Sequence, residues 1–323
     1  MSPVLVTGGN GYLGTQLIAA LLRDGRTVRA TVRSKGQEDG LRTAVRRGGA
    51  GDAGLEVVTA DLMSDDGWGA ALAGCEEIYH TASPIPSVQP KDPDELIVPA
   101  REGSLRVLRA ARDAGARRAV LTSSFAAVGY TPKASADYSE EDWTDPDTPG
   151  LAPYPRSKAV AERAAWELMK REGGETELVV VNPTFILGPT LTTDLRSSTQ
   201  LVKAMLDGTM SVAPRFRFGL VDVRDVADAH LRAMAVPEAA GKRYLAVADG
   251  PTLTFLEVAA ILRRHLGPQA ANAPTTEAAG DELPHLVIRN DRARAELGWR
   301  PRAVETTVVE TAESLRALGL IGG

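Results

Sequence analysis

The feature that most constrains this chain is the stretch at residues 4–14, VLVTGGNGYLG, in which a short apolar strand leads into a glycine-rich turn and then a helix. Gly8 allows the tight turn, Gly11 lets the backbone approach a pyrophosphate, and Gly14 lets the helix pack closely on the sheet. The start of the helix directs its backbone amides at the phosphates. The pattern predicts a dinucleotide-binding turn, with a glycine turn that binds no ligand as the alternative. The residues expected to contact the dinucleotide here are Gly8, Gly11, Tyr12, Leu13 and Gly14.

Composition excludes several classes of protein. With 323 residues the chain can bury a large core, and its net charge of −5 with scattered basic residues favours neither nucleic acid nor anionic membranes as partners. The single cysteine, Cys75, excludes an internal disulfide and a paired-cysteine zinc site. No apolar run reaches the ~20 residues of a membrane span, and the first strand begins too close to Met1 for a signal peptide. We expect a cytoplasmic protein that acts on a small molecule.

The second strand, expected at 26–32, ends in Arg33, Ser34 and Lys35. A site that prefers NAD places a carboxylate about 20 residues after the last glycine, where it holds the ribose hydroxyls. A guanidinium instead binds a 2′-phosphate through charge-assisted hydrogen bonds. Arg33 and Lys35 therefore predict NADP(H) as the cofactor, with a solvated basic loop as the alternative.

Two further strand ends are expected to border the cofactor. The third strand ends in Asp61 and Leu62, which can bind the adenine amino group and cover the ring, although Asp61 can also cap the next helix. The fourth strand, at 77–80, is followed by Thr81 and Ala82. These side chains are small, so they leave room for the pyrophosphate and the ribose.

A fifth strand delivers Ser123 and Ser124 to the carboxyl edge of the sheet, where ligands bind in open α/β sheets. Downstream, YPRSK places Tyr154 and Lys158 on one face of an expected helix. A nearby ammonium lowers the pKa of a phenol from about 10, so that the phenol exchanges protons more readily at neutral pH. Ser124 would donate to a carbonyl oxygen that Tyr154 protonates, while Lys158 would also hold the nicotinamide ribose. His80 is the competing general base, unless it is a packed strand residue.

Irregular segments are expected to form the substrate side of the site. Residues 84–93 and 131–153 are rich in proline and lack periodicity, and residues 190–218 are expected to be irregular and to cover the site. Ser197 and Ser198 in the last segment are candidate ligands of the pyrophosphate. The side chains expected to line the substrate pocket, with plain core packing as the alternative, are Ile85, Phe125, Phe185, Met205 and Met210.

The order of strands and helices predicts an α/β fold, a doubly wound parallel sheet (Rossmann) with a smaller, mostly C-terminal substrate lobe. Residues 1–182 are expected to form the NADP-binding Rossmann domain, rejoined by about 220–248. Residues 183–219 and 249–323 are expected to form the lobe. Asp225, in VDVRDVADAH, is expected to cap a helix.

Several motifs follow one another along nearly the whole chain: TGGNGYLG, VRATVRS, ADL, HTASP, TSSFAAV, YPRSKAVAE and NPTFILGP. In this order they resemble the extended short-chain dehydrogenase/reductase superfamily, and within it the dihydroflavonol reductases, cinnamoyl-CoA reductases and NADPH-dependent aldehyde or ketone reductases. The resemblance implies that Ser124, Tyr154 and Lys158 form the catalytic triad. It also implies that Arg33 binds the 2′-phosphate and that Pro183 lies beside the nicotinamide.

Two departures from this group bear on the substrate. Around the tyrosine this chain has APYPRSK where the cinnamoyl-CoA reductases have a motif like NWYCYxK, which weakens the case for a CoA thioester. Gly129 stands where the plant dihydroflavonol enzymes carry a substrate-binding asparagine, which weakens the case for a flavonoid.

These features predict an NADPH-dependent carbonyl reductase that converts a hydrophobic aldehyde or ketone to an alcohol, acting as a monomer or homodimer. One alternative is a nucleotide-sugar epimerase or dehydratase, which Arg33 disfavours because these enzymes usually hold NAD through an acidic residue. Another is a reductase of acyl-CoA thioesters. A regulatory protein that senses NADP without turnover is the non-enzymatic alternative, and the presence of both Tyr154 and Lys158 disfavours it.

Overall fold

A parallel sheet of seven strands forms the centre of the computed structural model, which describes residues 2–84, 92–195 and 198–322. The order across the sheet is β11-β7-β5-β4-β1-β2-β3, and each neighbouring pair is parallel. The predicted doubly wound fold is therefore confirmed. The strands are β1 (Val4–Thr7), β2 (Val28–Val32), β3 (Leu55–Thr59), β4 (Glu77–His80), β5 (Arg118–Thr122), β7 (Glu177–Pro183) and β11 (Arg243–Ala246).

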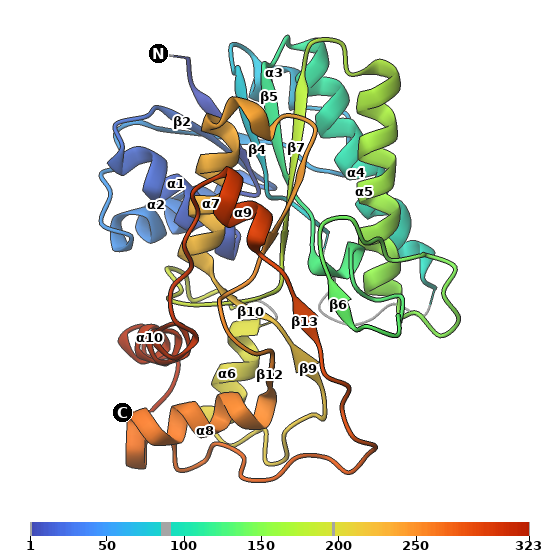
Figure 1. Ribbon diagram of the computed structural model, residues 1–323. Coiled ribbons are helices and arrows are strands. Elements are labelled where there is room, and N and C mark those ends of the chain that lie inside the picture. The colour runs from blue at the N-terminus through green and yellow to red at the C-terminus, as the bar shows by residue number, and fades with distance from the viewer. Residues whose placement is uncertain (1, 85–91, 196–197, 323) are drawn as a thin grey trace.

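Helices cover both faces of this sheet (Figure 1). Val4 and Val6 of β1 pack with one set of helices, α1 (Tyr12–Arg23), α2 (Glu38–Arg47) and α7 (Val223–Ala235). Leu5 points to the opposite face, which carries α3 (Trp68–Leu72), α4 (Asp94–Asp113) and α5 (Pro153–Glu172). Because helices cover both faces, β1 and β7 are buried along nearly their whole length, which explains their apolar runs, whereas β3 at the edge of the sheet is partly exposed.

A smaller lobe lies below the carboxyl edge of the sheet in the view of Figure 1. It has its own apolar core. Its helices are α6 (Ser198–Leu206), α8 (Phe255–Leu266) and α10 (Val304–Ala317), and α9 (Asp291–Glu296) lies beside β11. Short strand pairs complete the structure: β8 (Phe185–Leu187) with β10 (Leu220–Asp222), β9 (Arg217–Phe218) with β12 (Leu253–Thr254), and β6 (Asp137–Tyr138) with β13 (Val287–Ile288). Single 3-10 turns occur at η1 (Lys35–Gln37), η2 (Phe125–Ala127), η3 (Pro237–Ala239) and η4 (Gly267–Ala270). The domain boundaries given above remain predictions.

Two expectations from the sequence were wrong, the irregular segment at 190–218 and the helix cap at Asp225, whereas Met205 and Met210 follow the alternative of plain core packing. The segment at 190–218 is not irregular throughout, because it contains α6, whose apolar face packs into the core of the lobe. Met205 is 1% exposed in that core and Met210 packs against it, so neither side chain lines the substrate pocket.

The residue that caps α7 is Asp222, whose carboxylate accepts from the backbone N–H of Arg224. Asp225 instead lies inside the helix and accepts from the backbone N–H of Arg302.

Within the described ranges, no helix is both long and apolar enough to cross a membrane. The same part of the chain holds no cluster of three or more histidine, cysteine or acidic side chains that could hold a metal ion.

Candidate functional site

A cavity of about 1060 Å³ opens where the carboxyl ends of the central strands meet the smaller lobe. Such a crevice outside the carboxyl edge is where doubly wound sheets bind their ligands. The structure brings nearly all of the predicted site residues together there. Of these, the cavity is lined by Gly8, Gly11, Tyr12, Leu13, Gly14, Arg33, Asp61, Leu62, Thr81, Ala82, Ser123, Ser124, Phe125, Tyr154, Lys158, Pro183, Phe185 and Ser198. Lys35 is in η1 and is not part of the lining, and Ile85 and Ser197 lie outside the described residues.

The glycine turn has no room for side chains. Gly8 has φ +67°, and a Cβ added to it would lie 2.9 Å from Cα of Ala82. A Cβ on Gly14 would overlap the carbonyl oxygen of Gly8 and press on the backbone of Gly9. Gly11 precedes the first residue of α1, whose open N-terminal amides border the cavity. A tight, side-chain-free turn before a helix N-terminus fits a dinucleotide pyrophosphate.

The ends of β2 and β3 shape the other end of the cofactor region. Arg33 is exposed on the cavity wall, and its backbone N–H donates to Oε1 of Gln37 at 3.0 Å. Asp61 does not cap α3, which begins after Gly67. Instead, its carboxylate accepts from the backbone N–H of Met63 at 2.9 Å. The helix-capping role considered for Asp61 is therefore not found, and a local turn takes its place. The side chain still lies beside the cavity.

Three predicted cofactor residues use their side-chain hydroxyls within the protein. Thr81 donates to the carbonyl of Thr7 at 2.6 Å, and Ser198 donates to the carbonyl of Ile186 at 2.5 Å. The hydroxyl of Tyr12 donates to the carbonyl of Gly188, also at 2.6 Å, which joins α1 to the end of β8. These residues shape the wall of the cavity, and their roles toward a cofactor remain predictions.

Ser124, Tyr154 and Lys158 border the same cavity, although they come from different elements. Pro153 opens α5, and the helix then presents Tyr154 in its first turn and Lys158 one turn later. Lys158 Nζ lies 5.9 Å from the centre of the Tyr154 ring and donates to Oγ of Ser83 at 2.9 Å. Oγ of Ser124 accepts from the backbone N–H of Ala126 at 3.1 Å. Because that contact uses only a lone pair, the Ser124 hydroxyl keeps its proton for a ligand.

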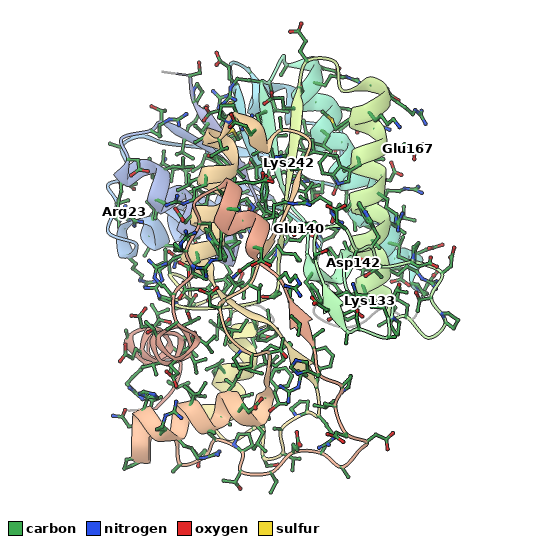
Figure 2. All side chains as sticks on the ribbon, in the orientation of Figure 1. Arg23, Lys133, Glu140, Asp142, Glu167 and Lys242 are labelled. Atoms are coloured by element: carbon green, nitrogen blue, oxygen red, sulfur yellow. The ribbon has the colours of Figure 1, made fainter. Side chains whose placement is uncertain are left out.

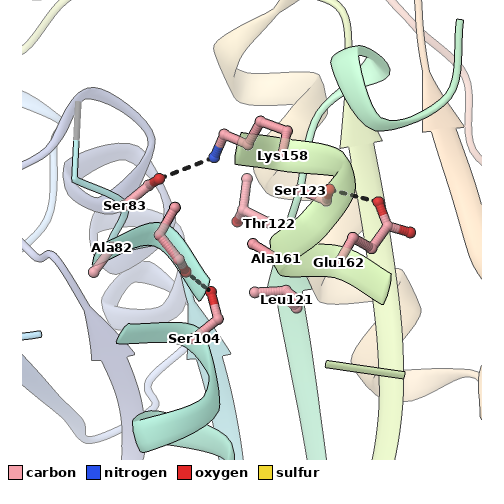
Figure 3. A pocket seen from close by; sticks show the side chains of 10 residues that line it. Ala82, Ser83, Ser104, Leu121, Thr122, Ser123, Lys158, Ala161 and Glu162 are labelled. Carbon is pink, nitrogen blue, oxygen red and sulfur yellow. Dashed lines mark hydrogen bonds between the residues drawn. The ribbon is translucent and has the colours of Figure 1, made fainter. Parts of the chain in front are cut away.

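Ser83 was not predicted as a partner of the lysine. Its only sequence signal is its place directly after the small residues that follow β4. Figure 3 shows Lys158 reaching across to it from α5, above a second cavity of about 10 Å³. That volume is about enough for one water molecule. Lys158 is 8% exposed and lines both this small cavity and the larger one.

His80 is packed inside the sheet rather than presented to the cavity. It is fully buried, and its Nδ1 shares a hydrogen bond of 2.7 Å with Oγ1 of Thr7. Burial, assisted by the charge of Lys158, lowers the pKa of His80 to about 3. A neutral imidazole that cannot reach the cavity cannot act as the general base. His80 is therefore the packed strand residue that was considered as the alternative.

Aromatic side chains line the end of the cavity away from the glycine turn. Phe125 meets the edge of Tyr138 with ring centres 5.8 Å apart, and Phe185 packs on Phe218 at 4.7 Å. Phe125 and Phe185 were predicted, but their partners Tyr138 and Phe218 were not, because both lie on two-residue strands without periodicity. A Cβ on Gly129 would overlap the Phe125 ring, so an asparagine cannot occupy this position unless that ring moves.

Fold and site together define an oxidoreductase with a dinucleotide-binding doubly wound domain. The sequence model of the NAD dependent epimerase/dehydratase family matches residues 4–247, so the chain belongs to that family, and the resemblance to extended short-chain dehydrogenase/reductases is confirmed. The chain is 34% identical to cinnamoyl-CoA reductase CAD2 of Medicago truncatula, over 97% of this chain and 95% of the relative. It is 31% identical to tetraketide alpha-pyrone reductase 2 of Arabidopsis thaliana, over 93% of each.

Solved structures of reductases also resemble this protein. The yeast methylglyoxal/isovaleraldehyde reductase Gre2, solved in complex with NADPH, superposes with a TM-score of 0.83 at 26% identity, over 99% of this chain and 100% of that one. Vestitone reductase from alfalfa gives 0.80 at 26% identity, with the same coverage. The predicted NADP(H)-dependent oxidoreductase class agrees with these relatives.

Proposed function

We propose that this protein is an NADPH-dependent carbonyl reductase that transfers a hydride to a hydrophobic aldehyde or ketone and releases an alcohol. The observation that carries the proposal is the placement of Ser124, Tyr154 and Lys158 around one cavity with the glycine turn. Relatives whose names describe reductases, one of them solved with NADPH, support it.

Bound NADPH would supply the hydride. The Ser124 hydroxyl donates to the carbonyl oxygen and stabilises the negative charge that develops there. Tyr154 transfers its phenolic proton to that oxygen, which completes the alcohol, and Lys158 stabilises the phenolate that is left. Ser83 holds the ammonium of Lys158 in place for this task. Solvent then returns a proton to the phenolate.

Arg33 supports the choice of NADPH over NADH. Its guanidinium lies exposed on the cavity wall at the end of β2, where an NAD site would carry a carboxylate. There it can bind a 2′-phosphate through two charge-assisted hydrogen bonds. The same residue argues against a nucleotide-sugar epimerase or dehydratase, although the family is named for such enzymes. We also propose that Asp61, Leu62 and Pro183 contact the cofactor.

The substrate side of the cavity supports a substrate with an apolar body. Its walls come from aromatic side chains of the main domain, such as Phe125, and of the lobe, such as Phe185. Apolar walls with a few polar groups at the reacting end are typical of small-molecule sites.

A second candidate is a reductase of acyl-CoA thioesters, which the 34% identity to a cinnamoyl-CoA reductase favours. The same three residues would serve, since a thioester also presents a carbonyl, but the thiol of CoA would leave as the aldehyde forms. APYPRSK around the tyrosine still departs from the motif of those relatives.

The experiment measures consumption of NADPH, and separately of NADH, with aromatic aldehydes, aryl ketones, β-keto esters and one aryl acyl-CoA. We expect NADPH to be consumed with the free carbonyl compounds, and NADH much more slowly. Release of free thiol from the acyl-CoA would favour the second candidate. Binding of NADPH without consumption in the presence of any of these compounds would refute both.

A further inference from the structure

A carboxylate that the proposed chemistry does not use is buried directly behind the site. Glu162 lies on α5, one turn after Lys158, and its side chain is 0% exposed. Its Oε1 accepts from Nε of Arg243 at 2.6 Å, in a salt bridge with a guanidinium that is only 7% exposed. Removing two charges from water is costly, so a buried pair of this kind adds little stability compared with apolar side chains. Its presence therefore calls for a role beyond holding the fold.

Glu162 receives a full set of hydrogen bonds from different elements. Oε2 accepts from the hydroxyl of Ser123 at 2.5 Å and from Nδ2 of Asn182 at 2.7 Å. Oε1 accepts from Arg243 and from the indole N–H of Trp166 at 3.3 Å. The carboxylate thus joins the end of β5, the end of β7, β11 and its own helix (Figure 3 shows the bond to Ser123).

Asn182 extends this set of contacts to the predicted catalytic serine. The Nδ2 group that donates to Glu162 also donates to the backbone carbonyl of Ser124, at 3.2 Å. One side-chain amide therefore holds the backbone of Ser124 against the helix that carries Tyr154 and Lys158. The amide thus links the backbone of the serine to the carboxylate on that helix.

Arg243 extends the contacts in the other direction, to the substrate side. Its Nη1 donates to the backbone carbonyls of Glu140 and Asp142, each at 2.9 Å, and its guanidinium stacks 3.6 Å from the centre of the Trp143 ring. The segment that it holds begins just after Tyr138, which lines the cavity. Figure 2 shows Glu140 and Asp142 on this segment beside the lower part of the sheet.

We propose that Glu162 and Arg243 act as a positioning pair, which fixes the serine turn and the substrate-side segment relative to the helix that carries the tyrosine and the lysine. This inference rests on the proposed function, because the chemistry that it serves is the reduction of a carbonyl group. Neither residue touches the reacting atoms. Their effect reaches the substrate through Asn182 and Ser124 on one side and through the segment that contains Tyr138 on the other.

Glu162→Gln tests the pair with little change in shape. The new amide directs an N–H group toward Ser123 and Asn182, or toward Arg243 and Trp166. In either orientation the amide N–H faces a group that cannot accept, Asn182 Nδ2 on one side or Arg243 and Trp166 on the other, although the Ser123 hydroxyl can turn to accept. If the Asn182 amide turns over, its oxygen faces the carbonyl of Ser124. Glu167→Gln is the matched control, since Glu167 is exposed on the same helix (Figure 2) and, among the residues that the structure describes, pairs with Arg171 one turn later.

A second comparison uses the arginine. Arg243→Lys keeps the positive charge but loses the planar group that reaches two carbonyls and stacks on Trp143. Its control is Lys242→Arg, because Lys242 is the preceding residue, is 38% exposed and pairs with Glu296 near the surface. If Glu162→Gln does not fold, Arg243→Lys and its control Lys242→Arg test the inference.

Each variant is measured for melting temperature, for Kd and stoichiometry of NADPH binding, and for kcat and KM of a carbonyl substrate. We expect kcat per NADPH-binding site to fall about 10- to 100-fold in Glu162→Gln and Arg243→Lys, the effect of a displacement of about 1 Å at the reacting atoms. The Kd of NADPH should stay within about twofold of wild type in both variants. The two control variants should keep kcat and Kd within about twofold of wild type, because exposed ion pairs contribute little. A pair that only supports the fold would lower the melting temperature but leave kcat per binding site unchanged, and that result would overturn the inference.

Failure of the proposed function has a different signature. In that case the wild-type protein binds NADPH without reducing any carbonyl compound. The inference is then judged by hydrogen exchange of the backbone amides at residues 123–128 and 138–144 in the NADPH-bound protein. Faster exchange in both segments of Glu162→Gln, but not of Glu167→Gln, supports the positioning role, and unchanged exchange refutes it.

Discussion

Replacing Gly14 by alanine adds one methyl group at the point where the first helix crosses the glycine turn. The added Cβ would overlap the carbonyl oxygen of Gly8 and lie 3.2 Å from its carbon and 3.3 Å from Cα of Gly9. All three are backbone atoms, so no side chain can rotate away. The start of α1 and the turn must move apart, and the amides that face the pyrophosphate move with them.

The size of the effect follows from these contacts. Overpacking of this kind costs about 1–3 kcal/mol of folding free energy. Loss of one charge-assisted hydrogen bond to a phosphate costs about 1.5–3 kcal/mol, which corresponds to a Kd about 10- to 100-fold weaker for NADPH. We therefore expect Gly14→Ala to weaken both folding and cofactor binding.

Gly40→Ala is the matched control. Gly40 also lies inside a helix, α2, but it is exposed and a Cβ there meets no atom within 4 Å. The alanine should raise the free energy of unfolding by about 0.5–1 kcal/mol, because glycine loses more entropy in a helix. The assays are urea unfolding and titration with NADPH. If Gly14→Ala binds NADPH as tightly as Gly40→Ala does, the glycine turn is not the phosphate site.

Two further predictions concern the cofactor and the dependence of stability on pH. Arg33→Ala should weaken NADPH binding about 10- to 100-fold and leave NADH binding unchanged, and calorimetric titration with both nucleotides would contradict the assignment if they weakened equally. His230 is fully buried, with Nε2 bonded to Oγ1 of Thr122, and burial lowers its pKa from 6.5 to about 4. The unfolded chain therefore takes up a proton below pH 6.5 that the folded protein does not take up until about pH 4, so stability falls as the pH falls through this range. By pH 5 this histidine removes about 2 kcal/mol, and His230→Gln should lose correspondingly less between pH 7 and pH 5 in urea unfolding. An identical loss in both proteins would refute this explanation.

The sequence predicted the sheet and the glycine turn because both are encoded locally. β1 and β7 are short, mainly apolar runs, and the turn is read from glycines three residues apart that the structure leaves no room to replace. YPRSK was equally readable, since helical spacing alone places Tyr154 and Lys158 on one face.

The features that could not be predicted from the sequence depend mostly on contacts between segments that are far apart in the chain. Arg243 lies 81 residues from Glu162, and the pairing of β11 with β7, together with the packing of α5 on β7, brings them together. The helix α6 and the burial of Met205 follow from a lobe core that α8 and α10 complete much later in the chain. Asp222 and Asp225 are equally good caps by residue type, and only the position where the helix begins separates them.

The most direct test of the central claim is the reductase activity of Tyr154→Phe beside that of the wild-type protein, with NADPH binding measured on both. The variant lacks only the hydroxyl that gives the proton. We expect its NADPH consumption with a carbonyl substrate to fall by at least about 100-fold, while its Kd for NADPH stays close to wild type. A variant that binds NADPH and reduces the same substrate at the wild-type rate would contradict the assignment of Tyr154 as the proton donor, and with it the proposed mechanism.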